Sequence, residues 1–256
     1  MSAAFAPAPD QKIAVITGGS SGIGAATARY LGRAGFAVVI GARRVDKLAE
    51  VAASVAGPVL ALPLDVTSDA SVAEFCAAIP RVNVLVNNAG GALGRETVAE
   101  GDLAKWQAMY DSNVLGTLRM TQGLLPKIIA SGDGHIVNLI SVAGSEVYDG
   151  GSGYTAAKHA QRALSETLRL ELNGEPVRIT DVSPGAVDTD FSLVRFGGDA
   201  EKAAKVYEGY TPLVADDVAD VITFAVTRPW HVNLDRIVMK PRAQATTMRF
   251  DRSGRN

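Results

Sequence analysis

A tyrosine and a lysine stand four residues apart in the stretch SGYTAAKH, at Tyr154 and Lys158. On a helix, side chains four residues apart lie on one face, with Cβ atoms about 5–6 Å apart. A phenol ionises with an ordinary pKa of about 10, and a nearby cation favours the phenolate and lowers that pKa. The spacing is therefore suited to acid–base chemistry by Tyr154. A half-exposed pair on the surface of an amphipathic helix would have the same spacing, so other residues must decide.

The composition is that of a globular protein with a substantial core. The chain has 256 residues, of which 47% are hydrophobic and 20% are charged, and its net charge is −2. This balance favours neither nucleic acid nor a membrane surface as a partner. One cysteine and three histidines give no metal-ligand spacing, so we expect no metal site. The sequence shows neither a secretory signal nor an apolar run of about 18 residues, and we expect a cytoplasmic protein.

Short apolar runs alternate with helical patterns from residue 12 onward. We expect strands at 12–17, 36–41, 59–65, 82–90, 135–141, 177–185 and 235–240. Helices are expected at 22–34, 45–55, 69–79, 102–130, 152–173 and 216–227, with a loop containing one or two helices at about 190–210. This alternation is typical of βαβ units, whose parallel strands are covered by helices on both faces. The sequence therefore predicts α/β architecture, with a single doubly wound Rossmann domain and a seven-stranded parallel sheet.

The domain is expected to fill most of the chain. We assign residues 1–11 to a disordered N-terminal tail, 12–242 to the Rossmann domain and 243–256 to a C-terminal tail whose last residues look disordered. A substrate lid is expected at about 190–212, between the last two strands.

A glycine-rich loop, TGGSSGIG, joins the first strand to the first helix. In a Rossmann fold this turn binds a pyrophosphate, because the helix N-terminus offers free amides and the positive end of its dipole. A purely structural turn would have a similar composition, and Thr27 stands where the strict G-x-G-x-x-G pattern needs its third glycine. The position after the first strand nevertheless favours a cofactor, with Gly18, Ser20, Ser21, Gly22, Ile23 and Gly24 as the contacts.

Two arginines follow the second strand, where an acid that binds the ribose of NAD is expected. The residues there are Arg43 and Arg44, in the stretch IGARRVDKL. Arginine binds a 2′-phosphate through charge-assisted and often bidentate hydrogen bonds. Solvated arginines at a helix start would look the same, but the pattern favours NADP over NAD.

The sequence resembles the short-chain dehydrogenase/reductase family. The resemblance is carried by the features above together with NNAG at 87–90, Asn113, Ser141 and PGAVDT at 184–189. The resemblance extends from residue 12 to about 240. A closer resemblance is to the NADP-dependent 3-hydroxy acid dehydrogenases that act on serine or L-allo-threonine. It is carried by ARR at 42–44, NNAGGALG at 87–94, FSLVRFGGD at 191–199 and RPWHVNLDRIVMKP at 228–241.

The resemblance implies a role for each residue of the catalytic set. Tyr154 would give its proton to a carbonyl oxygen in reduction, or take one from an alcohol in oxidation. Lys158, together with the positive nicotinamide of the oxidised cofactor, would lower the pKa of Tyr154, and it would also bind the nicotinamide ribose. Ser141 would hydrogen-bond the substrate oxygen, and Asn113 would hold a water that connects Lys158 to solvent.

The resemblance also implies further cofactor contacts. Asp65 and Val66 would contact the adenine, although Asp65 could instead cap the next helix. Asn87 would tie neighbouring strands together. The remaining contacts would be Asn88 and Gly90 at the cofactor wall, and Pro184, Gly185, Val187 and Thr189 around the carboxamide.

Arg195 lies in the expected lid and has two open interpretations. Its guanidinium could clamp a substrate carboxylate, or it could form a salt bridge within the lid to an acid such as Asp199. The clamp would make the substrate set Ser141, Tyr154 and Arg195.

The predicted function is hydride transfer between NADP(H) and a small hydroxy acid, such as a serine-like 3-hydroxy acid. The alternatives are reduction of a 3-ketoacyl thioester, a sugar or a xenobiotic ketone and, from another class, a non-catalytic NADP-binding regulator. The complete catalytic set argues against the regulator. By resemblance, a homotetramer or homodimer is expected, with the helices at 102–130 and 152–173 between subunits.

Overall fold

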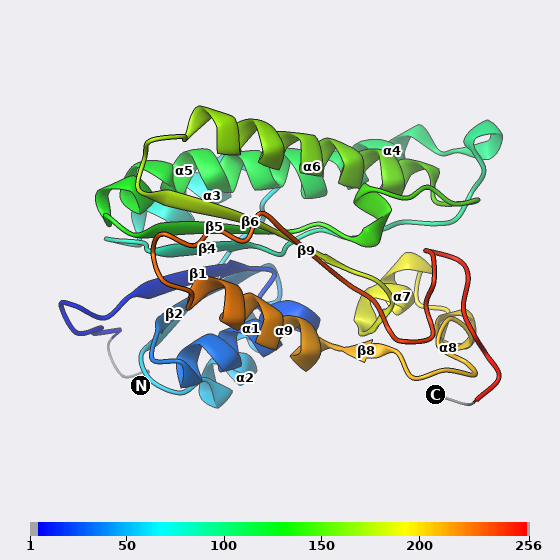
Figure 1. Cartoon of the computed structure of the whole chain (residues 1–256), viewed down its shortest axis with the longest axis horizontal. Coiled ribbons are helices and arrows are strands. Elements are labelled where there is room, and N and C mark those ends of the chain that lie inside the picture. The colour runs from blue at the N-terminus through cyan, green and yellow to red at the C-terminus, as the bar shows by residue number, and fades with distance from the viewer. Residues whose placement is uncertain (1–4, 255–256) are drawn as a thin grey trace.

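Seven parallel strands form the middle layer of the computed structural model, which describes residues 5–254 (Figure 1). The strands are β1 (Ile13–Thr17), β2 (Ala37–Ala42), β3 (Val59–Pro63), β4 (Val84–Asn87), β5 (Gly134–Leu139), β6 (Val177–Pro184) and β9 (Arg236–Met239). Their order in the sheet is β3-β2-β1-β4-β5-β6-β9, and every neighbouring pair is parallel. The predicted seven-stranded parallel sheet is confirmed.

The first strand shows why these apolar runs become strands. Successive side chains of a strand point to opposite faces of the sheet. Ile13 and Val15 pack in the apolar cluster on one face, whereas Ala14 and Ile16 pack in the cluster on the other. All four are fully buried. A strand covered on both faces has no polar side, which is why it reads as a continuous apolar run.

Two layers of helices cover the sheet (Figure 1). One face carries α1 (Gly22–Arg33), α2 (Val45–Ser54) and α9 (Ala215–Val226), and the other carries α3 (Asp69–Ala77), α4 (Leu103–Tyr110), α5 (Gly116–Ala130) and α6 (Ser152–Glu171). The lid contains α7 (Asp190–Arg195) and α8 (Ala200–Lys205). A second, two-stranded sheet of β7 (Val187–Asp188) and β8 (Leu213–Val214) connects it to the domain. The doubly wound architecture is as predicted.

The predicted helix at 102–130 is interrupted. A π-helical turn, Asp111–Leu115, separates α4 from α5, whereas Pro126 lies inside α5 near its end. A π turn inserts an extra residue into a helix and often marks a functional site. Asn113, one of the predicted catalytic residues, lies within this turn.

The two predicted tails contact the domain wherever the structure describes them. At the N-terminus, Phe5 packs against an apolar cluster and Gln11 donates to the carbonyl of Gly35 at 2.9 Å. At the other end, Gln244 is buried and Phe250 stacks on Tyr210 with ring centroids 4.7 Å apart. The aromatic and amide side chains of the predicted C-terminal tail thus pack against the lid and the strand ends. The expected disorder of its last residues, 251–256, stays a prediction. The remaining tail residues, 1–4 and 255–256, lie outside the described part of the chain.

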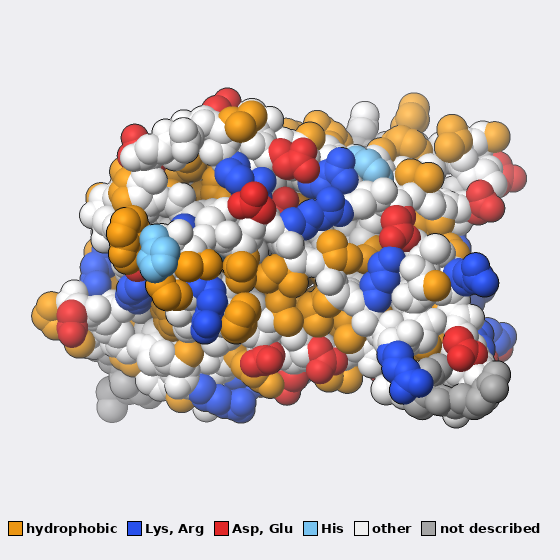
Figure 2. Space-filling model, in the orientation of Figure 1, with side chains coloured by type: hydrophobic (Ala, Val, Ile, Leu, Met, Phe, Trp, Pro, Cys, Tyr) orange, Lys and Arg blue, Asp and Glu red, His pale blue; other side chains and the backbone are white. Residues whose placement is uncertain are grey.

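Apolar side chains are exposed along one edge of the sheet. Figure 2 shows hydrophobic side chains gathered across the middle of this view, over β9 and α9. Phe224 and Val238 are each 51% exposed, and β9 is the last strand of the sheet. An apolar edge strand can pair with another chain. The expected homo-oligomer stays a prediction. Across residues 5–254, no helix has both the length and the apolar character needed to span a membrane.

Buried polar side chains connect the central strands to α6. Asn87 on β4 donates to Asn138 on β5 at 2.9 Å, so it ties two strands together as predicted. Asn138 donates to Ser165 at 2.9 Å, and the Ser165 hydroxyl donates to the carboxylate of Asp181 on β6. Asp181 is fully buried, and burial raises its pKa to about 6 against the opposing effects of Ser165 and of Arg169.

We predict that Asp181→Asn stabilises the protein above pH 6 and changes its stability little near pH 4. In the unfolded chain Asp181 ionises at its ordinary pKa of about 3.9, whereas in the native chain it ionises at about 6. The group therefore stabilises the parent below its unfolded pKa, and this contribution is lost as the pH rises through the native pKa. The two pKa values differ by an amount that changes the free energy of unfolding by about 3 kcal/mol between low and high pH. The asparagine side chain still offers an oxygen that accepts from the Ser165 hydroxyl.

Urea unfolding of both chains between about pH 4 and pH 7 measures the difference. Asp220→Asn, at an exposed position of α9, is the control and should give no pH-dependent gain. An equal effect of Asp181→Asn at every pH would contradict the assignment of a buried, titrating carboxyl.

Candidate active site

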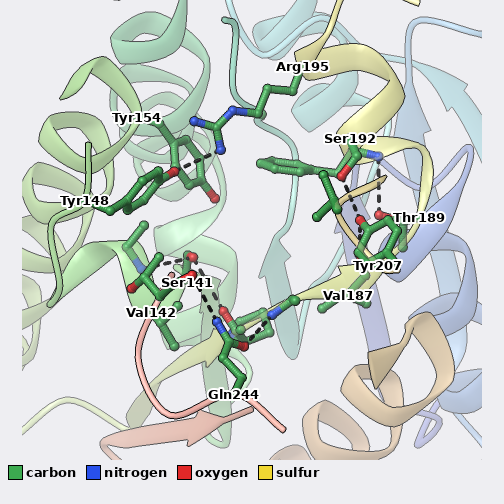
Figure 3. A pocket seen from close by; sticks show the side chains of 18 of the residues that line it. Ser141, Val142, Tyr148, Tyr154, Val187, Thr189, Ser192, Arg195, Tyr207 and Gln244 are labelled. Carbon is green, nitrogen blue, oxygen red and sulfur yellow. Dashed lines mark hydrogen bonds between the residues drawn. The ribbon is translucent and has the colours of Figure 1, made fainter. Parts of the chain in front are cut away.

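A cavity of about 420 Å³ opens at the carboxyl ends of β4, β5 and β6 and is covered by the lid (Figure 3). Ligands bind at this edge of open α/β sheets. The cavity brings together predicted residues from six separate parts of the sequence. These are Ile23, Asn88, Gly90, Ser141, Tyr154, Lys158, Pro184, Gly185, Val187, Thr189 and Arg195.

The glycine loop is shaped by close backbone contacts. Gly18 has a φ of +67°, and a Cβ there would lie 2.8 Å from Nδ2 of Asn88. That amide nitrogen donates to the carbonyl of Thr17 at 2.8 Å and to that of Gly18 at 3.3 Å. A Cβ on Gly24 would lie 2.4 Å from the carbonyl oxygen of Gly18. Larger residues at these two positions would push the loop away from the first turn of α1.

The start of α1 can receive an anion. Its first turn contains no acidic residue, and no side chain within residues 5–254 caps it, so the amides of that turn remain available. Arg44 reaches this end and donates to the hydroxyl oxygens of Ser20 at 3.3 Å and Ser21 at 2.6 Å. Free amides, a dipole end, two hydroxyls and a guanidinium fit the phosphate groups of a dinucleotide.

Arg43 and Arg44 differ in their surroundings. Both side chains are exposed at the start of α2, as in the alternative of solvated arginines, but Arg44 also contacts the glycine loop. Arg43 is exposed, and its charge helps to lower the pKa of Asp65. In the described part of the chain neither arginine forms an ion pair with a carboxylate.

Asp65 does not cap the next helix, contrary to the alternative considered for it. Its Oδ1 accepts from the amide of Thr67 at 3.0 Å and from the Thr67 hydroxyl at 2.7 Å, and these two bonds lower its pKa. The N-cap of α3 is Ser68. Val66 is buried against the start of α5, where a Cβ on Gly116 would lie 2.8 Å from the Val66 Cγ2. Contact of Asp65 and Val66 with an adenine stays a prediction.

Asn113 supports the turn that walls the cavity. It is fully buried, and its Nδ2 donates to the carbonyls of Gly91 at 2.9 Å and Met109 at 2.7 Å. A Cβ on Gly90, whose φ is +146°, would lie 2.4 Å from the Asn113 Oδ1. Asn113 therefore positions the Gly90–Gly91 backbone. Its role in holding a water stays a prediction.

Tyr154 and Lys158 lie on the buried face of α6. Their exposed fractions are 8% and 5%, so the alternative of a half-exposed surface pair is wrong. The Lys158 Nζ lies 5.8 Å from the centroid of the Tyr154 ring and donates to the carbonyl of Leu139 at 2.9 Å and to Oε1 of Gln161 at 2.8 Å. Phe191 of the lid packs against the Tyr154 ring at a centroid distance of 5.5 Å. The pair is thus shielded from water by the lid.

Burial shifts the two pKa values in opposite directions. It raises the pKa of Tyr154, and the neighbouring Tyr148 adds to this effect, while Ser141 and Arg195 oppose it. Burial also lowers the pKa of Lys158 to about 7. Among the protein groups, desolvation therefore outweighs the neighbouring charges, so the protein alone does not lower the Tyr154 pKa. The expected contribution of the oxidised nicotinamide stays a prediction. Near neutral pH the Tyr154 hydroxyl is protonated and able to donate.

Ser141 follows β5 and lies at the cavity wall. Its Oγ accepts from the amide of Ala143 at 3.1 Å and donates weakly to the carbonyl of Pro184 at 3.4 Å (Figure 3). Such a long bond is easily exchanged for a better acceptor. The hydroxyl can therefore turn toward an oxygen bound beside Tyr154.

Arg195 ends α7 and points into the cavity (Figure 3). Its Nε donates to the carbonyl of Gly94 at 3.0 Å, and its two terminal nitrogens donate to the hydroxyl of Tyr148 at 2.9 Å and to the carbonyl of Gly150 at 3.2 Å. The guanidinium carbon lies 5.9 Å from the centroid of the Tyr154 ring. The salt-bridge alternative is wrong, because Asp199 caps α8 and pairs with Lys202 at 3.0 Å.

Sequence reasoning missed several residues of the site. Tyr148 binds Arg195, Gln161 binds Lys158, and Gln244 accepts from the amide of Ala186 at 2.9 Å. The aromatic residue in the loop before α6 was a usable signal for Tyr148. A glutamine carries no such signal, since it is common on exposed helix faces and in tails.

The C-terminal segment forms part of the cavity wall, which the sequence did not indicate. Thr247, Met248 and Phe250 line the cavity. The Arg252 guanidinium lies over the rings of Tyr210 and Phe250, at 5.2 and 5.4 Å from their centroids. It also donates to lid carbonyls, so this segment and the lid are joined.

Comparison with known proteins gives one consistent family. The family described as short chain dehydrogenase matches residues 12–195. An uncharacterised oxidoreductase of Mycobacterium tuberculosis is 59% identical over 239 residues, which cover 93% of this chain and 94% of that protein. The NADP-dependent 3-hydroxy acid dehydrogenase YdfG of Salmonella typhi is 39% identical over 238 residues, covering 91% and 96%. A solved structure of serine dehydrogenase, in its closed form with NADP⁺, superposes with a TM-score of 0.88 at 37% identity and covers 91% of this chain and 96% of that one.

Proposed function

Since the chain belongs to the short-chain dehydrogenase family of oxidoreductases, we propose that it transfers a hydride between NADP(H) and a small hydroxy acid, such as a serine-like 3-hydroxy acid. The observation that carries the substrate class is Arg195, whose guanidinium points into the cavity 5.9 Å from the Tyr154 ring. The named relatives that act on 3-hydroxy acids or serine support the same class.

The cofactor of this proposal is NADP. Arg44 at the glycine loop and Arg43 beside it provide the positive charge for a 2′-phosphate. YdfG is named as NADP-dependent, and the solved serine dehydrogenase holds NADP⁺. Bound NADP supplies the hydride, and the protein supplies orientation and the proton.

Tyr154 is the proposed general acid and base. Its hydroxyl is protonated near neutral pH, so in reduction it donates a proton to the substrate carbonyl oxygen and becomes the phenolate. Oxidation is the reverse step, in which the phenolate takes the proton from the alcohol. The Ser141 hydroxyl holds that substrate oxygen beside the phenol. Phe191 excludes water from the Tyr154 ring. The Lys158 amine lies 5.8 Å from the centroid of the Tyr154 ring.

Arg195 is the proposed carboxylate clamp. A guanidinium has five N–H donors, and three of the Arg195 donors bind neutral acceptors. Two donors remain, and no carboxylate within the described residues pairs with this group. A substrate carboxylate would complete the set with two charge-assisted hydrogen bonds. A thioester or a xenobiotic ketone would leave the cation without an anion, which is why an acid is favoured.

The direct test of the function follows NADPH formation with L-serine, L-allo-threonine and 3-hydroxypropionate, using NADP⁺ and NAD⁺ separately. Reduction of NADP⁺ by at least one of these acids is expected. Turnover of neutral alcohols alone would contradict the acid class and favour the other carbonyl substrates.

We predict that replacing both Arg43 and Arg44 with alanine weakens NADPH binding by at least about 100-fold, because each charge-assisted hydrogen bond to a phosphate contributes about 1.5–3 kcal/mol. NADH binding, measured by the same fluorescence titration, should change by less than about threefold. Lys47→Ala removes an exposed cation from the same helix and is the matched control. Equal weakening of both cofactors would mean that the arginines serve only the fold of the loop.

Arg195→Leu should lower kcat/KM for 3-hydroxypropionate by about 100-fold, the loss expected for a charged hydrogen-bonded clamp. The neutral analogue 3-hydroxypropionamide should lose much less, and Arg195→Lys should give an intermediate value because it keeps the charge without the fork. The amide analogue is the internal control for damage to the loops that Arg195 holds. An equal loss for acid and amide would show that Arg195 acts through those loops.

A further inference from the structure

A glutamine that has no assigned role lies one turn beyond Lys158 on the buried face of α6. Gln161 is fully buried. Its Oε1 accepts from the Lys158 Nζ at 2.8 Å, and its Nε2 donates to the hydroxyl of Thr117 at 2.9 Å. The Thr117 hydroxyl in turn donates to the backbone carbonyl of Asn113 at 2.8 Å. One hydrogen-bonded chain therefore runs from Lys158 to the π-helical turn.

The direction of each bond in this chain is determined by its end groups. The carbonyl of Asn113 can only accept, so the Thr117 hydroxyl donates its one hydrogen to it. The Thr117 oxygen must therefore accept from the Gln161 amide nitrogen. The amide oxygen of Gln161 then faces Lys158, whose amine donates to it. All donors point away from Lys158, and a neutral amide cannot pass a proton outward along such a chain without changing its tautomer.

The same argument applies to the second partner of Lys158. The carbonyl oxygen of Leu139 accepts from Nζ at 2.9 Å. Both protein partners of the amine are thus oxygen atoms that only accept, and they bind an N–H whether the amine is charged or neutral. Two of the three N–H positions of the amine therefore keep their hydrogens in both the charged and the neutral form. The third position, which gains or loses the proton, faces the cavity that Lys158 lines.

We propose that Gln161 is a positioning residue of the reaction. With the carbonyl of Leu139, it holds two N–H groups of Lys158, so that the proton which this amine gains or loses is carried on its cavity side. The proposal rests on the proposed hydride transfer, in which Lys158 acts beside Tyr154. It also assigns Thr117 as the residue that orients Gln161.

The groups around Lys158 define what should change when Gln161 is altered. Tyr154 faces it from the same helix, Arg195 lies over the Tyr154 ring from the lid, and Tyr148 contacts Arg195. The buried Asp181 on β6 is held by Ser165, one turn farther along α6. Burial lowers the Lys158 pKa to about 7. The hydrogen bond at Oε1 is stronger when the amine is charged, so changing it alters the free energy of the charged form more than that of the neutral form.

The experiment measures the Lys158 titration by NMR of the ligand-free protein labelled with ¹³C at lysine Cε, with the signal identified by its loss in Lys158→Met. In Gln161→Met, which keeps the length of the side chain but lacks the acceptor, the Lys158 pKa should fall by about one unit. In Gln161→Glu it should rise by a similar amount, because a carboxylate favours the ammonium. The pH profile of kcat should move in the same direction as the titration in each variant.

Ser165→Ala is the control, since it breaks buried hydrogen bonds on the same helix face without contacting Lys158. It should lower stability and leave both the titration and the pH profile in place. An unchanged Lys158 titration in folded Gln161→Met would overturn the proposal, as would a loss of kcat that is equal at every pH. The titration needs no substrate, so it stands even if none of the hydroxy acids is turned over.

Discussion

The burial of the Lys158 amine is the constraint on which the rest of the site depends. An amine taken out of water destabilises the fold unless its N–H groups find acceptors. Here the acceptors are the neutral oxygens of Leu139 and Gln161, not a carboxylate, so the charge is solvated without being neutralised. The pKa of Lys158 consequently falls to about 7, while burial raises that of Tyr154. The ordinary pKa values of a lysine and a tyrosine are similar, and burial shifts them in opposite directions here. This favours a protonated phenol beside an amine that titrates near neutral pH.

Several elements satisfy this constraint together. The end of β5 supplies a carbonyl, α6 supplies both the lysine and the glutamine, and the π-helical turn supplies the last acceptor of the chain. The same turn places Asn113 against Gly90, which shapes the cofactor side of the cavity. On the substrate side, Arg195 ties the loops at Gly94 and Gly150 to the lid. The lid thus carries both the proposed recognition of the acid and the cover over Tyr154.

The fold could be predicted from the sequence because parallel strands that are covered on both faces are recognisable as short, continuous apolar runs. The run IAVI at 13–16 is wholly apolar and is soon followed by glycines, and both the run and its glycine loop lie where they were expected. The spacing of Tyr154 and Lys158 likewise indicated a shared helix face. The π-helical turn could not be predicted, since one inserted residue hardly disturbs the apolar period of a helix. The contacts of the C-terminal segment could not be predicted either, because the stacking of Phe250 on Tyr210 joins residues forty apart in the sequence.

The direction of the Tyr154 pKa shift marks the limit of reasoning from spacing. A neighbouring cation predicts a lower pKa, but desolvation predicts a higher one, and their balance depends on packing that the sequence does not specify. Gln161 presents the same difficulty, because a glutamine in a helix is usually solvated, and only the docking of α6 against the sheet and α5 makes it a buried partner.

The most direct test of the account compares the parent protein with Tyr154→Phe in the reduction of 3-oxopropionate by NADPH, with NADPH affinity measured separately by fluorescence. The account predicts that the phenylalanine variant binds NADPH within about threefold of the parent. It also predicts that kcat/KM falls by about 100- to 10,000-fold, the range expected for loss of a general acid. Turnover by the variant within about tenfold of the parent would contradict the account, because the proton would then come from a group other than Tyr154.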